Sequence, residues 1–299
     1  MAHAKRSNLA LLFLLLAASS GPAVGQERAA PANPAAQTDA GVTIVRDVVY
    51  GHKAGMALTY DVLRPAKPNG AAVINMISGG WRSQWAAPES RVNGYRDLLD
   101  RGFTVVALHH GSQPQFTIPE ATADAKLGVR FFRLHAADYG VDPDRIGVWG
   151  SSAGGQLSLV AALIGDPGDP AATDPVLRAP LKVRTAVAYF PPSDIGQLVT
   201  PFLKPEQIAL PENAPDLLRS ISPVFFVDAA DPPVLVIHGD ADTQVSVAQS
   251  RRLHEVLDAA KVENRLIIMP GAGHGFRGAQ GEQARAAMLD WFTTHLLAP

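Results

Sequence analysis

The chain has 299 residues, with 26 lysines and arginines against 28 aspartates and glutamates, and it contains no cysteine. The near-neutral charge and the absence of a long basic run exclude a polybasic surface for nucleic acid or anionic membrane. The missing thiols exclude disulfides, a cysteine nucleophile and thiolate metal sites. The length suits one large α/β domain, with two small domains as the alternative.

The N-terminal 25 residues have the pattern of a secretory signal peptide. Lys5 and Arg6 precede an apolar run over residues 9–18, and small residues follow up to Gly25. The run is too short for a stable transmembrane helix, although an uncleaved anchor is the alternative. We therefore expect residues 1–25 to be removed on export, leaving a secreted or periplasmic protein with no membrane attachment. Residues 26–41, rich in Ala and Pro, predict a disordered linker before a catalytic domain over 42–299.

The first half of this domain begins with strands. Val42–Tyr50 and Met56–Arg64 are β-rich segments around a turn and predict an antiparallel hairpin. Apolar runs at Ala71–Ile77 and Phe103–Leu108 predict buried strands. Helices are expected in the two amphipathic segments of this half, Ser90–Arg101 and Pro119–Ala137.

The second half alternates strands and helices. Strands are predicted near 146–150 and over Val183–Phe190, Pro233–His238 and Arg265–Met269, and helices over Gln156–Ile164, Val247–Ala260 and Gln283–Leu297. The proline-rich, irregular segment 191–231 is a candidate cap or lid. This alternation predicts an α/β fold with a mostly parallel central sheet, an antiparallel N-terminal start and helices on both faces. Active sites in such sheets lie beyond the carboxyl ends of the strands.

One strand–turn–helix segment carries a nucleophile motif. Gly150, Ser152 and Gly154 fit the pattern Gly-x-Ser-x-Gly, between an apolar strand and a helical stretch. This is the context of a nucleophile elbow, where small residues are needed because strand and helix pack closely. The alternative is a helix N-terminus capped by Ser151 or Ser152.

A catalytic serine needs a base, and the base needs an orienting acid. In a serine-first hydrolase fold the acid and then the histidine follow the serine along the chain. Asp242 and Asp240 both follow the strand at 233–238, and we favour Asp242 because Asp240 lies in a tight Gly-Asp turn that it would hold. His274 lies in a glycine-flanked loop after the strand at 265–269 and is the predicted base.

The oxyanion of an acyl-transfer intermediate needs fixed N–H donors. We expect one from Ala153, which follows the serine at a helix N-terminus, and others from Gly79 and Gly80, where the backbone can approach a ligand closely. A simple tight turn is the alternative for these glycines. The side chains expected to contact substrate are Trp81, Gln113, Phe190 and Phe276, for which packing under a lid is the alternative.

Taken in order, these segments resemble the α/β-hydrolase superfamily, in its acetyl esterase/lipase, feruloyl-esterase-like and prolyl-oligopeptidase-like branch. The resemblance rests on Tyr60–Pro65, Ser78–Trp81, Asp142–Ile146, Gly150–Gly155, His238–Asp242, Gly273–Phe276 and Trp291–Phe292. It implies a triad of Ser152, Asp242 and His274 that works without metal or cofactor. The oxyanion loop departs from the usual His-Gly-Gly-Gly-Trp, because Ile77 and Ser78 replace the histidine and the first glycine, so the support of this loop must differ.

We therefore expect an exported serine carboxylesterase that forms an acyl-enzyme. Its expected substrates are acetyl or feruloyl esters on plant polysaccharide, or small generic esters. One alternative is a serine peptidase of prolyl-oligopeptidase type, which is weaker because no propeller is predicted before the catalytic domain. The other is a non-catalytic binding protein with an α/β-hydrolase fold.

Overall fold

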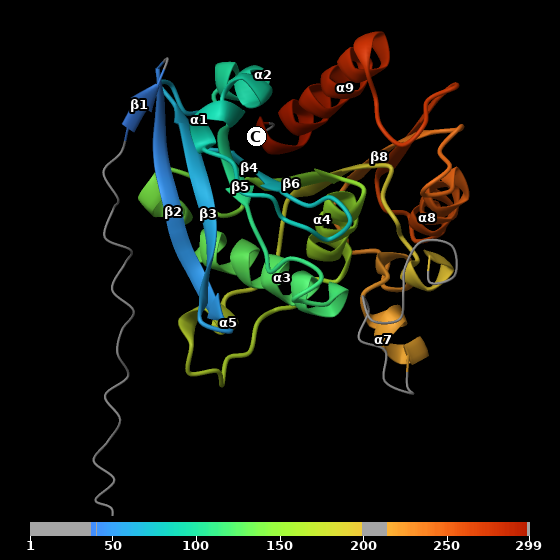
Figure 1. The fold of residues 1–299 in the computed structure, drawn as a ribbon, viewed down its shortest axis with the longest axis horizontal. Helices are drawn as coiled ribbons and strands as arrows, with labels where there is room; N and C mark the ends of the chain where they lie inside the picture. Colours follow the sequence, from blue (N-terminus) through green and yellow to red (C-terminus); the bar gives the residue numbers. More distant parts are fainter. Residues whose placement is uncertain (1–36, 40, 199–213, 298–299) are drawn as a thin grey trace, which may run out of the picture. The chain divides into compact units, whose positions relative to one another are not determined.

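The computed structural model describes residues 37–39, 41–198 and 214–297. Their strands form one nine-stranded sheet in the order β1-β2-β3-β5-β4-β6-β7-β8-β9 (Figure 1). The strands are β1 Gln37–Asp39, β2 Val42–Lys53, β3 Met56–Pro65, β4 Ala72–Met76, β5 Thr104–Leu108, β6 Ile146–Ser151, β7 Thr185–Tyr189, β8 Val234–Gly239 and β9 Asn264–Met269. From β5 to β9 neighbouring strands pair in parallel, whereas β1, β2 and β3 pair antiparallel. The predicted sheet with an antiparallel start is thus confirmed.

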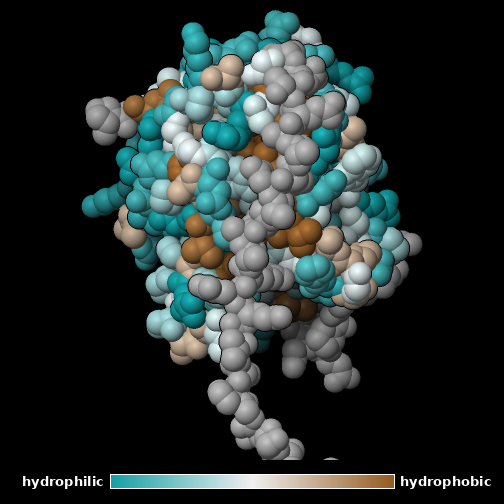
Figure 2. All heavy atoms as spheres, turned by 90° about the vertical axis from the view of Figure 1, so that its left-hand side faces the viewer, coloured by the Kyte–Doolittle hydropathy of each residue, from teal (hydrophilic) through white to brown (hydrophobic). Residues whose placement is uncertain are grey.

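The antiparallel edge of the sheet includes a strand that the sequence did not predict. Gln37–Asp39, assigned to the disordered linker, pair with Val42–Ile44 as β1. The linker prediction is therefore corrected at this end, because these residues continue the ladder of the hairpin. The surface visible on the β1–β2 side is mainly hydrophilic, with apolar residues in small separate groups (Figure 2). The predicted signal peptide and, apart from Gly41, the rest of the linker lie outside the described residues.

Helices cover both faces of the sheet. The α-helices are α1 Pro88–Arg91, α2 Arg96–Asp100, α3 Ile118–Leu134, α4 Ala153–Leu163, α5 Pro175–Arg178, α7 Ala214–Ser220, α8 Val247–Ala259 and α9 Gly278–Leu297, and the short 3-10 helices are η1 Asn93–Tyr95, η2 Ala136–Tyr139, η3 Ile195–Leu198 and η4 Pro223–Phe225. None of the helices in the described part of the chain is both long and apolar enough to cross a membrane.

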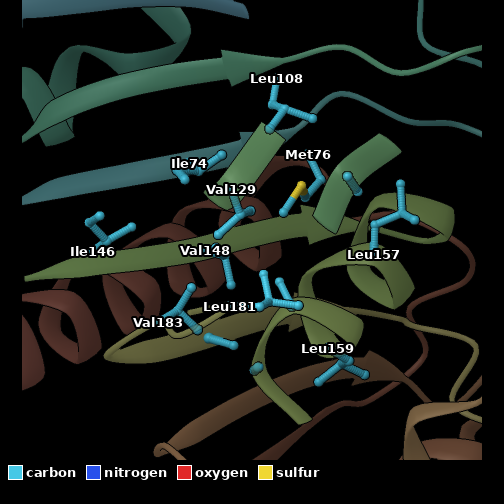
Figure 3. Packing of buried hydrophobic residues seen from close by; sticks show 14 of the residues in the cluster. Ile74, Met76, Leu108, Val129, Ile146, Val148, Leu157, Leu159, Leu181 and Val183 are labelled. Carbon is cyan, nitrogen blue, oxygen red and sulfur yellow. The ribbon is translucent and has the colours of Figure 1, made fainter. Parts of the chain in front are cut away.

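Alternating side chains of the strands pack into two separate hydrophobic cores, one on each face of the sheet. Ile74 of β4 packs in one core with residues of α3, α4 and α8, part of which is drawn in Figure 3. Its neighbour Val73 belongs to the other core, with residues of α2 and α9 such as Leu98 and Phe292. Because successive side chains of a strand point to opposite faces, two such cores sandwich the parallel strands and fix their ends in place.

The helix predicted over Ser90–Arg101 is broken into three short pieces. α1 ends at Arg91, η1 covers Asn93–Tyr95, and α2 begins at Arg96. Asn93 and Gly94 lie at the break, and both are poor helix formers. The chain therefore turns between α1 and α2 instead of continuing one helix.

The candidate lid at 191–231 is described only at its two ends, because residues 199–213 lie outside the described part. At the first end the backbone N–H groups of Ser193 and Asp194 both donate to Oε1 of Gln249 on α8, at 2.8 Å. At the second end Ser222 is buried, and its hydroxyl accepts from Ile195 N–H at 2.8 Å. The first end is thus fixed to α8, and the second is joined to the first and, through Ile221 O, which accepts from Gln156 at 2.8 Å, to α4.

Candidate active site

The predicted elbow lies at the junction of β6 and α4. Ser152 has φ 53° and ψ −120°, a conformation that L-residues rarely adopt. A Cβ on Gly150 would lie 2.4 Å from the backbone of Gly154, and a Cβ on Gly154 would lie 2.5 Å from the carbonyl oxygen of Met76. The two flanking glycines are therefore required by close backbone packing. Ser152 occupies the N-cap position of α4, but its side chain makes no capping hydrogen bond, so the capping alternative is wrong for this residue.

The structure brings the three predicted triad side chains together from the ends of three strands. His274 Nε2 lies 2.8 Å from Ser152 Oγ, and His274 Nδ1 lies 2.7 Å from Asp242 Oδ2. Since the carboxylate can only accept, the imidazole donates from Nδ1, which leaves Nε2 to accept the Ser152 hydroxyl proton. This is the geometry of a nucleophile, a base and an orienting acid.

The Asp242 carboxylate is completely buried and fully hydrogen-bonded. Its Oδ1 accepts from the backbone N–H groups of Gln244 at 2.8 Å and Val245 at 2.9 Å. Burial acts to raise the pKa of Asp242, but the hydrogen bonds from His274 and from these N–H groups outweigh it and hold the pKa below its usual value. Asp242 is thus ionised at neutral pH.

The competing carboxylate, Asp240, has a structural partner instead. Its exposed side chain accepts from Gly271 N–H at 2.7 Å, which ties the loop after β8 to the loop after β9. This agrees with the predicted loop-holding role of Asp240. Because these two loops carry Asp242 and His274, the tie helps to keep acid and base at their observed separation.

A second histidine, which sequence reasoning did not place in the site, contacts the acid. His238 Nε2 lies 2.9 Å from Val245 O and 3.3 Å from Asp242 Oδ2, and Nδ1 lies 2.6 Å from Ser250 Oγ. The ring is completely buried, and burial lowers the pKa of His238. A neutral ring that donates from Nε2 adds a favourable dipole beside the carboxylate. Its position four residues before Asp242, at the end of β8, is the sequence signal that could have found it.

The oxyanion loop differs from the prediction at Gly79. Its N–H donates to Arg82 O at 3.0 Å, and Arg82 N–H donates back to Gly79 O at 3.0 Å. Gly79 is therefore already paired and is not a donor for substrate in this arrangement. Among the described residues, the N–H groups of Gly80, Trp81 and Ala153 have no protein partner. These three are the candidate oxyanion donors, with Trp81 added to the two that the sequence suggested.

A serine–histidine contact replaces the missing histidine of the loop. His110 Nε2 lies 2.9 Å from Ser78 Oγ, and His110 Nδ1 lies 2.9 Å from Gly111 O. The carbonyl can only accept, so Nδ1 carries the proton and Nε2 accepts the Ser78 hydroxyl. Burial lowers the pKa of His110, which keeps the ring neutral. The oxyanion loop is thus supported from the loop after β5.

The four predicted substrate-contact residues divide into two pairs. Phe190 lies beside the base, with its ring 4.6 Å from the His274 ring and 5.2 Å from the Phe276 ring. Trp81 is buried, and its indole donates to Gln156 Oε1 on α4 at 3.0 Å. Gln113 is also buried, and its N–H donates to Trp81 O at 3.2 Å. The indole of Trp81 and the backbone N–H of Gln113 therefore support the oxyanion loop, and contact of these two residues with substrate stays a prediction.

Within the part of the chain that the structure describes, no group of three or more His, Asp and Glu side chains is placed to hold a metal ion. The chemistry of the described site is that of a serine, a histidine and an aspartate with adjacent backbone donors. Such a set can carry out acyl transfer with its own groups.

Comparisons with known proteins identify the family that the chain matches. A profile of the BD-FAE family matches residues 60–257. Esterase LipQ of Mycobacterium tuberculosis is 30% identical over 214 residues, which make up 68% of this chain and 50% of LipQ. The chain thus spans about half the length of this curated relative.

Solved structures extend the likeness over most of the chain. A truncated carbohydrate esterase from gut microbiota is 29% identical with a TM-score of 0.71, and the match covers 90% of this chain and 100% of that one. Thermogutta terrifontis esterase 2 with propionate bound is 25% identical with a TM-score of 0.70, covering 87% of this chain and 97% of that one.

Proposed function

The chain belongs to the BD-FAE family of the α/β-hydrolase superfamily, and on this premise we propose that it is a serine carboxylesterase that works through an acyl-enzyme. The observation that carries the proposal is the continuous hydrogen-bonded relay from Ser152 through His274 to Asp242. The names of its relatives as esterases support the same reaction class.

The proposed reaction begins with attack of Ser152 Oγ on the ester carbonyl carbon. As the bond forms, the hydroxyl proton passes to His274 Nε2, and ionised Asp242 stabilises the resulting imidazolium. The oxyanion accepts hydrogen bonds from the N–H groups of Ala153 and of Gly80 or Trp81. Collapse breaks the bond to the alcohol, which takes the proton from His274. Water, activated by the same imidazole, then attacks the acyl-enzyme, and the acid leaves.

We propose acetyl or feruloyl esters on plant polysaccharide, or small generic esters, as the substrates. Two of the similar solved structures support this class of substrate. One is described as a carbohydrate esterase, and the other has propionate bound. The ring of Phe190 beside the base, and that of Phe276 packed against it, supply apolar surface for an acyl group.

The test is hydrolysis of p-nitrophenyl esters of rising acyl length, together with acetylated xylan and methyl ferulate. We expect turnover that falls by at least about a thousandfold in Ser152→Ala, whereas Ser220→Ala, which changes an exposed serine of α7, keeps the wild-type rate. A fluorophosphonate should label the wild type but not Ser152→Ala. Cleavage of proline-containing peptide anilides without ester turnover would favour the peptidase, and absence of labelling would favour a binding protein.

Export is part of the same proposal. It is supported by the basic residues Lys5 and Arg6 and by the apolar run at 9–18. N-terminal sequencing of the protein recovered from the periplasm or the medium should begin near Gln26. Retention of the leader on protein that stays with the membrane fraction would contradict it.

A further inference from the structure

A polar cavity of about 500 Å³ lies beside the proposed active site and has no part in the mechanism above. Its lining includes Ser151, which precedes the nucleophile, Ser78 and Gly79 of the oxyanion loop, and the side chains of Arg82, Arg91 and Trp149. It therefore opens at the carboxyl ends of β4 and β6, where a substrate held by Ser152 would extend. A volume of this size suits a sugar-sized group.

Two guanidinium groups give the cavity a positive charge. Among the described residues, no carboxylate lies within 4 Å of Arg82 or Arg91, and no Asp or Glu lines the cavity. Arg91 acts at longer range on buried Asp61, but burial raises the pKa of that carboxyl and so disfavours its charge. Arg82 is thus available to an anion, whereas Arg91, which lies against the Tyr95 hydroxyl, adds its charge from the wall. The planar fork of arginine suits a carboxylate.

Arg91 is a fixed part of the cavity wall. Arg91 is held in place because its Nη2 donates to Gln84 O at 2.9 Å. Within the described part of the chain, Arg91 Nε and the indole Nε1 of Trp149 are buried without a hydrogen-bond partner. Since these two atoms are closed off from solvent, the groups of the wall that can meet a ligand are the exposed side chains of Arg82 and Trp85.

We propose that this cavity is a subsite for a carboxylate that the substrate carries close to its scissile ester. The exposed indole of Trp85, 63% accessible, also lines the cavity and offers an apolar face to a sugar ring. The preferred substrates are then esters of acidic sugars, such as an acetylated uronic acid, or esters whose acyl group ends in a carboxylate. This inference rests on the proposed function, because it specifies the substrate of the same site.

The experiment compares each acidic ester with its neutral amide, in two arms. An acetylated glucuronic acid against the acetylated glucuronamide tests a carboxylate on the alcohol half. Mono-p-nitrophenyl adipate against its terminal amide tests a carboxylate on the acyl half. We expect kcat/KM to favour the acid by about tenfold or more in one arm, mainly through KM, and the preference to shrink as salt is added.

Variants of the cavity arginines test whether the preference for the acid over the amide arises from this cavity. Arg82→Gln should reduce the acid-to-amide ratio by about tenfold, and Arg82→Glu should reverse it. Arg91→Lys should keep part of the preference, since it retains the charge but loses the fork. Arg251→Gln, which alters an exposed arginine of α8, is the matched control and should leave the ratio unchanged. Arg82 is exposed, so its variants are expected to fold.

The outcomes distinguish an error in the subsite proposal from an error in the esterase proposal. Ester turnover with equal kcat/KM for acid and amide in both arms, or a preference that Arg82→Gln does not change, would overturn the subsite alone. If no ester is turned over, titration of Ser152→Ala with glucuronate, followed by indole fluorescence, still tests it. Saturable binding weakened by Arg82→Gln would uphold the subsite, and no saturable change would overturn it.

Discussion

The hydrogen bonds of Asp242 make this carboxylate the residue whose charge matters most for the proposed reaction. Asp242→Asn keeps the shape of the side chain but removes the charge, and its amide can donate to His274 and favour the wrong tautomer. We expect kcat for a p-nitrophenyl ester to fall by about 10³- to 10⁴-fold at pH 7 with little change in KM. Stopped-flow or steady-state assays of the purified variant measure this directly.

Asp240→Asn is the matched control for that substitution. Its carboxylate accepts one hydrogen bond, from Gly271 N–H, and an amide oxygen can accept the same bond. We expect less than about a fivefold change in kcat. A loss in Asp240→Asn as large as that in Asp242→Asn would contradict the assignment of the acid.

The contact between Ser78 and His110 is the second feature at the level of single residues. If it holds the oxyanion loop, Ser78→Ala and His110→Phe should each lower kcat by about tenfold, more than they raise KM. Because both variants break one contact, the double variant should lose little more than either single one. A double-mutant cycle on kcat measures this coupling, and strictly additive losses would show that the two side chains act separately.

Among the elements, the junction of β6 and α4 has very close backbone packing. A Cβ on Gly154 would meet the Met76 carbonyl at 2.5 Å, so Gly154→Ala must push α4 away from β4. We expect a loss of about 1–3 kcal/mol in the free energy of unfolding, measured in urea, and a large fall in kcat.

Gly94→Ala provides the control for this prediction. Gly94 lies in η1, where an added Cβ would have no atom within 4 Å. Alanine also restricts the unfolded chain more than glycine does, so the variant should be as stable as the wild type or slightly more stable. Equal destabilisation by the two variants would contradict the packing explanation.

The sequence predicted those features that depend on local pattern and chain order. The strands and the elbow follow from apolar runs and glycine spacing, and the order of Ser152, Asp242 and His274 follows from the fold. The hydrogen bond of Trp81 to Gln156 joins residues 75 positions apart, so its burial could not be predicted locally. The pairing of Gly79 with Arg82 depends on the path of the loop backbone, which two glycines leave undetermined.

Across the described part of the molecule, the pKa values of several buried or half-buried histidines favour the neutral form. The pKa values of His109, His110, His238 and His295 are all lowered, in each case first by burial. Each takes up a proton more readily in the unfolded chain than in the folded one. Their contribution to stability is therefore complete above the unfolded pKa, near 6.5, and is lost as pH falls toward the folded pKa.

His109 should dominate this acid sensitivity. Its pKa falls from 6.5 to about 4, through burial and then the positive charge of Arg91, and among the described residues neither buried ring nitrogen has a hydrogen-bond partner. A shift of this size corresponds to about 3 kcal/mol of stability lost between pH 6.5 and 4.

Urea denaturation at several pH values should show this fall in the free energy of unfolding of the wild type and a flatter profile in His109→Gln, whatever the absolute stability of that variant. An unchanged slope in His109→Gln would mean that the other buried histidines, or the carboxylates, cause the acid sensitivity.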